Sequence, residues 1–202
     1  MRRQALFSGL LIGLGAAGYL ALGGIPGAVI FAFGLIGVVL TGFPLYTGKA
    51  GVLPLKKSWN LLEIWFWNVV GCLLVGLVLK FADVGYLANA TAIVSNRLKG
   101  GVEVFLLPSF LKAVGCGVII DIAVWSSKTY GSKLPVLFGV PLFIVCGFYH
   151  SIADVVYLTA AWNWNPAIPW YYLSIFLGNY VGCNVRRLVL PKSNKYVVQP
   201  EI

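Results

Sequence analysis

Six apolar segments, each about as long as a transmembrane helix, dominate this chain of 202 residues. A membrane-spanning helix needs about 20 mostly apolar residues, because it crosses a hydrocarbon layer about 30 Å thick. The segments cover residues 6–22, 28–46, 61–79, 105–124, 134–158 and 170–190. Hydrophobic residues make up 59% of the chain and charged residues 10%, more apolar surface than a water-soluble globule can bury. We therefore predict an all-α membrane protein with six transmembrane helices in a single domain, residues 1–202.

The basic residues stand singly or in pairs at the ends of the apolar segments, although the formal net charge is +9. This pattern indicates membrane topology and argues against nucleic-acid binding. With a cytoplasmic N-terminus, eleven Lys and Arg residues face the cytoplasm: Arg2, Arg3, Lys49, Lys56, Lys57, Lys128, Lys133, Arg186, Arg187, Lys192 and Lys195. Four lie outside or at the outer rim: Lys80, Arg97, Lys99 and Lys112. The positive-inside rule thus predicts that both termini face the cytoplasm. The plasma membrane is the expected location.

No set of side chains has the spacing of a metal or cofactor site. The cysteines, Cys72, Cys116, Cys146 and Cys183, all lie inside apolar segments, without close pairing. We interpret them as buried, unreactive thiols and expect no metal and no cofactor.

The two halves of the chain repeat each other. Asn68 and Gly71 form an Asn-x-x-Gly motif in the third segment, and Asn179 and Gly182 form the same motif in the sixth. The second segment is interrupted by Gly or Pro at residues 41–44, and the fifth at residues 141–147. Three spans followed by three spans place the halves in opposite orientations, so the pattern predicts an inverted repeat with broken second and fifth helices. Gly and Pro are also common in membrane helices, and chance recurrence is the alternative.

Several short motifs, in order along the chain, resemble the formate/nitrite transporter family. Residues Cys146 to Asp154 resemble the family's Gly-Phe-Glu-His-Ser-x-Ala-Asn signature on the fifth span. Leu45 to Gly48 resembles the Leu-Phe-Thr-Gly loop that breaks the second span, and Ile122 to Trp125 resembles the end of the fourth. Phe7 to Gly15 is similar to the start of the first span, so the resemblance extends over nearly the whole chain.

The resemblance implies a homopentamer in the lipid bilayer, each protomer having its own aquaporin-like pore. The expected substrate is a small monovalent anion or its weak acid, such as formate, nitrite, hydrosulfide, acetate or lactate. By matching position, His150 is the central histidine and Thr47 its partner. Lys99 lies within two residues of the position of the family's outer-vestibule lysine. The apolar residues that narrow the pore fall at Phe31, Leu35, Leu45, Tyr46, Ile120 and Phe143.

Elementary electrostatics supports such a mechanism. A bare anion in a narrow apolar constriction carries a large desolvation cost, whereas the neutral weak acid does not. The positive ends of half-helix dipoles and a nearby Lys would attract the anion. A proton from His150, or from water polarised beside it, would then let the neutral form cross.

Four positions depart from the family pattern. Tyr149 replaces a Glu, Asp154 an Asn, Gly117 an Asn of the fourth span, and Lys49 the Asn after Thr-Gly. Asp154 follows His150 by four residues, which places both on one face of a regular helix. A carboxylate there favours imidazolium and reduces the positive field, so the substrate can differ from formate or nitrite.

A further departure is Asp121, a carboxylate where the family is usually apolar or Cys. An ionisable residue inside a span costs enough to require a partner or a function. We expect Lys49 to pair with Asp154 or with Asp121. Either carboxylate can instead face a subunit contact or the cytoplasmic mouth, and the apolar pore candidates are packing residues unless the resemblance holds.

Three other functions compete with an anion channel. A membrane enzyme would use His150 with Asp154 or Asp121, but the chain has a single His, no metal-ligand cluster and no nucleophile elbow. An aquaporin-type channel for water or neutral solutes is suggested by Asn165-Pro166-Ala167, although only one such triplet is present. A non-conducting membrane scaffold is the third.

Overall fold

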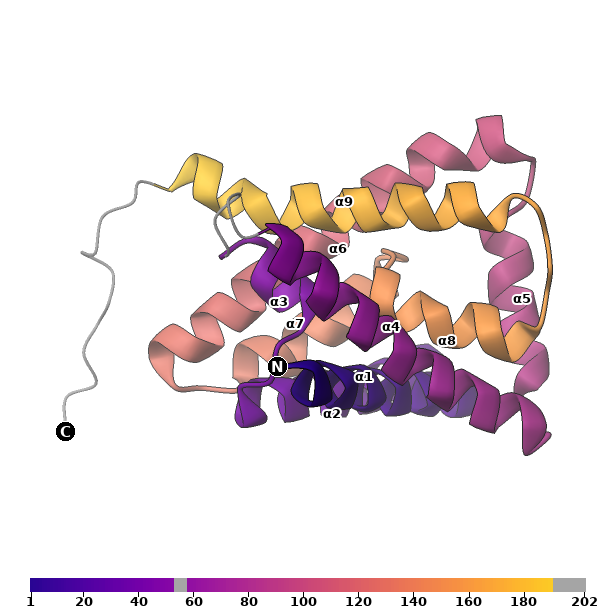
Figure 1. The fold of residues 1–202 in the computed structure, drawn as a ribbon, viewed down its shortest axis with the longest axis horizontal. Helices are drawn as coiled ribbons and strands as arrows, with labels where there is room; N and C mark the ends of the chain where they lie inside the picture. Colours follow the sequence, from indigo (N-terminus) through magenta and orange to yellow (C-terminus); the bar gives the residue numbers. More distant parts are fainter. Residues whose placement is uncertain (53–57, 191–202) are drawn as a thin grey trace.

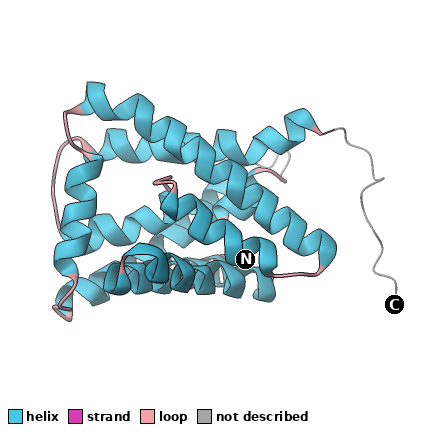
Figure 2. Ribbon diagram, turned by 180° about the vertical axis from the view of Figure 1, so that it is seen from behind, coloured by secondary structure: helices cyan, strands magenta, loops and turns pink. Residues whose placement is uncertain are grey.

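The computed structural model describes residues 1–52 and 58–190, and the described chain consists of helices joined by short loops, without strands (Figure 2). Four helices are long and apolar enough to cross a membrane, namely α1, α2, α4 and α6. The helices have the following bounds: α1 (Arg2–Leu22), α2 (Gly24–Thr41), α3 (Tyr46–Ala50), α4 (Ser58–Phe81), α5 (Leu87–Arg97), α6 (Val102–Tyr130), α7 (Leu134–Val145), α8 (Ser151–Ala161) and α9 (Ile168–Val189). The second span is α2 with α3, the fifth is α7 with α8, and the sixth is α9.

Large apolar side chains cover the outside of the bundle. Phe33 is 59% exposed, Leu107 63% and Phe138 69%, far more than a water-soluble protein would leave in contact with solvent. A helix that is apolar on all sides is stable when lipid surrounds its outer face. The exposed apolar side chains are therefore those of an integral membrane protein.

The halves of the fold pack alike. α1 packs against α4 and α2 in the first half, and α6 packs against α9 and α7 in the second. In Figure 1, α9 and α6 lie along one side of the bundle, α1 and α2 lie along the opposite side, and α8 lies between them. The predicted inverted repeat of three plus three spans is thereby confirmed.

Both breaks in the spans have the same backbone. Gly42 has φ 68° and Gly147 has φ 69°, a left-handed conformation that costs glycine little. The short helix resumes four residues later in each half, after the extended residues Leu45 and His150. The first break begins where residues 41–44 predict it. The second begins only after Val145, because Pro141 is accommodated inside α7.

The polar stretch between the third and fourth spans folds as α5, which packs against α8 and α1 and stands across one end of the bundle (Figure 1). Of the predicted cytoplasmic basic residues, Lys56, Lys57, Lys192 and Lys195 lie outside the described residues.

Candidate functional site

The two short half-helices are each held by the amide of an Asn from the repeat motif. The Asn179 oxygen accepts a hydrogen bond from the backbone N–H of Ser151 at 2.8 Å, and its nitrogen donates to the Tyr149 carbonyl at 2.9 Å. The same amide nitrogen donates to the Ala113 carbonyl on α6 at 2.9 Å. Because the first N–H groups of a helix have no partner within it, this side chain anchors the start of α8.

Asn68 makes the equivalent three bonds in the other half. Its oxygen accepts from the backbone N–H of Tyr46 at 2.8 Å, and its nitrogen donates to the carbonyls of Pro44 at 3.1 Å and Ala5 at 2.7 Å. The Asn-x-x-Gly repeat is thus the device that positions the two half-helices. Its oxygen and nitrogen satisfy buried backbone groups that would otherwise be unpaired in the membrane.

A cysteine completes each motif, which the sequence analysis missed. The Cys72 thiol donates to the Gly9 carbonyl at 3.1 Å, and the Cys183 thiol lies 3.2 Å from the Thr47 carbonyl and 3.5 Å from the Gly117 carbonyl. Both cysteines directly follow the motif glycine, so an Asn-x-x-Gly-Cys repeat was available as a signal. Cys116 is also buried, whereas Cys146 is exposed, contrary to the prediction.

Gly117 is a packing residue at the crossing of α6 and α9. A Cβ added there would lie 2.6 Å from the carbonyl oxygen of Asn179 and 2.9 Å from the Cα of Gly182. Gly9 and Gly71 make the matching close approach between α1 and α4. Gly117 therefore serves the close packing of α6 on α9, where a side chain as large as the expected Asn cannot fit.

Gly117→Ala is expected to destabilise the protein by about 1–3 kcal/mol, because an overpacked contact must push the two helices apart. Thermal unfolding of the purified protein in detergent measures the effect. Gly85→Ala is the control, since a Cβ at Gly85 has no atom within 4 Å. Equal melting temperatures for the two variants would contradict the tight crossing.

His150 and Thr47 meet where the two broken spans face each other. The Nε2 atom of His150 lies 3.1 Å from the Thr47 Oγ1, and both side chains are buried. Each residue lies at the start of a half-helix, His150 as the residue before α8 and Thr47 in the first turn of α3. The structure thus brings together two residues that are 103 positions apart in the chain.

The hydrogen bonds of His150 assign its tautomer. The backbone N–H of Ala153 donates to Nδ1 at 3.2 Å, so Nδ1 carries a lone pair and the proton of the neutral ring is on Nε2. Nε2–H then points at the Thr47 hydroxyl. A doubly protonated ring would turn Nδ1 into a donor facing another donor, so the local fold favours the neutral ring.

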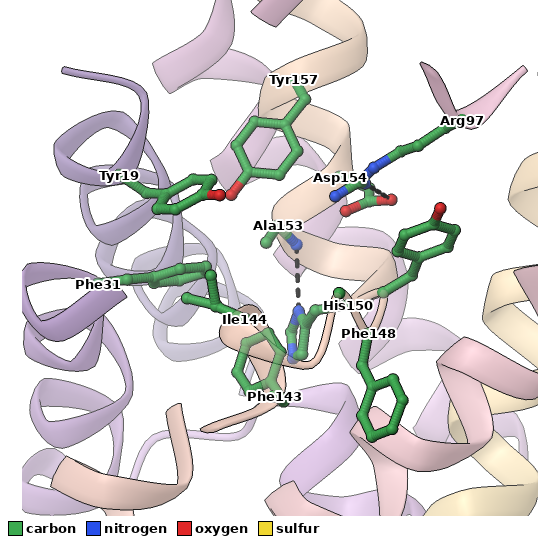
Figure 3. A pocket seen from close by; sticks show the side chains of 12 residues that line it. Tyr19, Phe31, Arg97, Phe143, Ile144, Phe148, His150, Ala153, Asp154 and Tyr157 are labelled. Atoms are coloured by element: carbon green, nitrogen blue, oxygen red, sulfur yellow. Dashed lines mark hydrogen bonds and ion pairs between the residues drawn. The ribbon is translucent and has the colours of Figure 1, made fainter. Parts of the chain in front are cut away.

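A cavity of about 90 Å³ lies on the α5 side of His150 (Figure 3). Phe31 and Phe143 narrow it toward the histidine, and their ring centroids are 6.0 Å apart. The Phe143 ring is also stacked at 6.0 Å from the imidazole. We call this space the outer cavity; its lining residues are Tyr19, Phe31, Arg97, Phe143, Ile144, Gly147, Phe148, Tyr149, His150, Ala153, Asp154 and Tyr157.

A second, smaller space opens near the α2–α3 break. Leu35 and Leu45 line it, and so do Lys49 and Lys128. Its volume is about 10 Å³, roughly the space that a single water molecule occupies. We call it the inner cavity. It contains two of the predicted residues, Leu35 and Leu45, and places Lys49 beside a lysine that the sequence analysis assigned only to topology.

Two other predicted constriction residues line neither cavity. Tyr46 stacks on Phe176 at 4.9 Å, and its hydroxyl donates to the Phe176 carbonyl at 3.0 Å. This contact ties α3 to α9. Ile120, on α6, is 1% exposed and lies in the hydrophobic core.

Arg97, and not Lys99, reaches the outer cavity. Arg97 is the last residue of α5 and lines the cavity, whereas Lys99 is exposed in the following loop. Arg97 lies two residues before Lys99, within the slip that the resemblance allowed, and a vestibule role for Lys99 stays a prediction. The helical register decides which residue reaches the cavity, because side chains two positions apart at the end of a helix point in different directions.

Both buried carboxylates pair with arginines. Asp154 forms an ion pair with Arg97 and accepts a hydrogen bond from the Tyr171 hydroxyl. The Asp121 carboxylate accepts two bonds from Arg186, at 2.6 and 3.3 Å. The expected pairing of Lys49 with either carboxylate is therefore wrong.

Tyr149 lies between two cations. The Lys112 Nζ donates to its hydroxyl at 3.2 Å, and the Arg97 guanidinium lies 4.4 Å from its ring centroid. Tyr149 is therefore an aromatic cation binder, and the Arg97 that it contacts also pairs with Asp154.

Two features bear on the competing functions. Asn165 lies in the connection before α9, where its side chain accepts from the Ala167 N–H at 2.9 Å, and not at a break. Within residues 1–52 and 58–190, no group of three or more His, Cys, Asp or Glu side chains could hold a metal ion.

The sequence matches known transporters. The formate/nitrite transporter family matches residues 2–190. The uncharacterized transporter YrhG of Bacillus subtilis is 28% identical over 188 residues, 80% of this chain and 68% of its own. The probable formate transporter of Methanothermobacter thermautotrophicus is 26% identical over 219 residues, 87% of this chain and 79% of its own. The nitrite transporter NirC of Escherichia coli is 25% identical over 148 residues, 67% of this chain and 55% of its own.

Solved structures share the fold. A pentameric formate channel with formate bound superposes with a TM-score of 0.75 at 22% identity, over 90% of this chain and 91% of that one. An ion channel of the FNT family gives a TM-score of 0.76 at 21% identity, over 91% and 85% of the two chains. The aquaporin-like inverted repeat with broken second and fifth helices is thereby confirmed. Its relatives are transporters and channels, not enzymes, and this chain belongs to the formate/nitrite transporter family.

Proposed function

We propose that the protein conducts small monovalent anions, or their weak acids, through a pore in each protomer, with a proton assisting passage at His150. Formate, nitrite, hydrosulfide and short carboxylates are the candidate substrates. The observation that carries the proposal is the His150–Thr47 contact of 3.1 Å, which lies beside Phe31 and Phe143 on one side and Leu35 and Leu45 on the other.

The two apolar constrictions require the substrate to cross in its neutral form. An anion that leaves water for a site lined by Phe and Leu loses most of its hydration energy, whereas its conjugate acid loses little. The anion therefore takes up a proton beside a hydrogen-bond donor that lies between the Phe constriction and the Leu constriction. His150 Nε2–H and the Thr47 hydroxyl are the two donors there.

The tautomer supports water as the proton source. The neutral ring has its single proton on Nε2, and giving it up would leave an imidazolate. Donating that N–H to the substrate instead polarises it without charging the ring. A water molecule in the outer cavity then supplies the proton, and hydroxide returns to the aqueous side.

The proposal includes the assembly and its orientation. The solved formate channel of the same fold is pentameric, and we propose a homopentamer here. Six crossings place the Arg2 end of α1 and the Arg186 end of α9 on one side, and the excess of basic residues predicts that this side is the cytoplasm. The plasma membrane is the proposed location.

Stopped-flow measurements on proteoliposomes test the function. Inward gradients of formate, nitrite and hydrosulfide are expected to collapse faster than in protein-free liposomes, and osmotic water flux is expected to stay at the protein-free rate. Water flux without anion flux would support the aquaporin-type alternative. No flux of any kind from a correctly assembled protein would favour the scaffold.

The inner cavity supplies a second test. Lys49 and Lys128 line it without an ion pair among the described residues, so they raise the local anion concentration. The Lys49→Gln/Lys128→Gln double variant is expected to lower formate flux several-fold at low ionic strength and less at high salt. Lys133→Gln, on the same side but outside the cavity, is the control. A salt-independent loss would contradict an electrostatic role.

A further inference from the structure

The outer cavity contains one positive and one negative side chain, and they are bound to each other. Arg97 comes from the end of α5 and Asp154 from the first turn of α8. Figure 3 shows the two side chains meeting above His150. The Asp154 side chain is 1% exposed and the Arg97 side chain 14% exposed, so water screens the pair only weakly.

The guanidinium has little surface left for another anion. Its faces are covered by the rings of Tyr149 at 4.4 Å and Tyr157 at 5.1 Å. Its Nη1 atom binds Asp154 and also donates to the Tyr171 hydroxyl at 3.1 Å. An incoming anion therefore meets a guanidinium whose charge Asp154 already offsets, and it must compete with that carboxylate for Arg97.

The two cavities differ in charge as a result. The inner cavity contains Lys49 and Lys128 and no carboxylate, whereas the charges in the outer cavity cancel. Lys112 is exposed and contacts Tyr149 without lining the outer cavity. The part of the outer cavity around Arg97 thus contains the tyrosines Tyr149 and Tyr157, and its lining side chains carry no net charge.

We propose that Asp154 is a specificity-determining residue of the outer cavity. By pairing with Arg97, it makes this entrance favour weak acids over permanent anions. The inference rests on the proposed anion or weak-acid conduction. A weak acid enters as its neutral form or becomes neutral by taking a proton from water. A permanent anion, such as nitrate, has no neutral form at any working pH and finds no free cation there.

The test is nitrate inhibition of formate flux, measured in proteoliposomes with nitrate added on the α5 side. The wild type is expected to be nearly insensitive. Asp154→Asn frees Arg97, and half-inhibition is expected at a nitrate concentration at least about tenfold lower, which corresponds to about 1.4 kcal/mol. The Arg97→Gln/Asp154→Asn double variant is neutral again and is expected to return to wild-type insensitivity.

Asp83→Asn is the matched control. It makes the same chemical change on an exposed residue of the turn between α4 and α5, where Asn tolerates the local φ of 47° as Asp does. It removes one negative charge from this side of the protein without touching the cavity. Nitrate sensitivity equal to that of Asp154→Asn would overturn the inference in favour of a surface-charge effect.

The remaining outcomes separate the two proposals. Wild-type protein that conducts no formate defeats the proposed function. Wild-type conduction with unchanged nitrate sensitivity in Asp154→Asn defeats only the role of Asp154. If Asp154→Asn does not assemble, Arg97→Gln serves as the reference: its unpaired carboxylate is expected to slow formate flux, and the double variant must restore it. Failure of that restoration also overturns the inference.

Discussion

Formate flux through His150→Phe is expected to be roughly 10- to 100-fold lower than through the wild type, the loss expected when a hydrogen bond worth about 1.5–3 kcal/mol to a charged group disappears. Phe keeps the ring and the apolar packing against Phe143 but removes the Nε2–H donor that faces Thr47. The measurement is stopped-flow uptake in proteoliposomes over a range of pH.

His150→Asn is the matched variant for this prediction. Asn retains a side-chain N–H and is a good residue before a helix start, where its oxygen can replace Nδ1 as acceptor for the Ala153 N–H. We expect it to recover part of the lost flux. Undiminished, pH-independent uptake by His150→Phe would refute the proton-assisting role of the histidine.

Asn179→Leu is expected to lower the stability of the protein by about 2–6 kcal/mol, since the Ser151 N–H and the Tyr149 carbonyl lose their partner and each buried unsatisfied group costs about 1–3 kcal/mol. Leu has the same branched skeleton as Asn and is somewhat larger, so a cavity does not explain the loss. Thermal unfolding in detergent, followed by flux measurements on any assembled protein, gives both effects.

The repeat provides a second, equivalent test of this prediction. Asn68→Leu removes the same bonds from Tyr46 and Pro44, so its loss of stability is expected to be of similar size. Asn96→Leu makes the same change on the exposed side of α5 and is expected to be neutral. A large loss in only one half would contradict the equivalence of the two anchors.

The sequence by itself determined the membrane environment, the six spans, the repeat and the family. These follow from local properties: segment length sets the crossing of the bilayer, and Gly42, Gly147 and the Asn-x-x-Gly motifs set the breaks. The proximity of His150 to Thr47 was inferred from the resemblance and is present in the structure. Their roles in transport stay a prediction.

Only the tertiary structure decided the partners of the charged groups. Asp154 and Asp121 lie in spans that several basic residues can reach, and nothing in the order of residues distinguishes Lys49 from Arg97 or Arg186. The direction of the α5 terminus brings Arg97 to Asp154, and the crossing of α6 and α9 brings Arg186 to Asp121. Likewise, the sequence alone suggested that Gly117 replaces a polar residue. The close contact with Asn179 shows that the helix crossing has no room for a side chain.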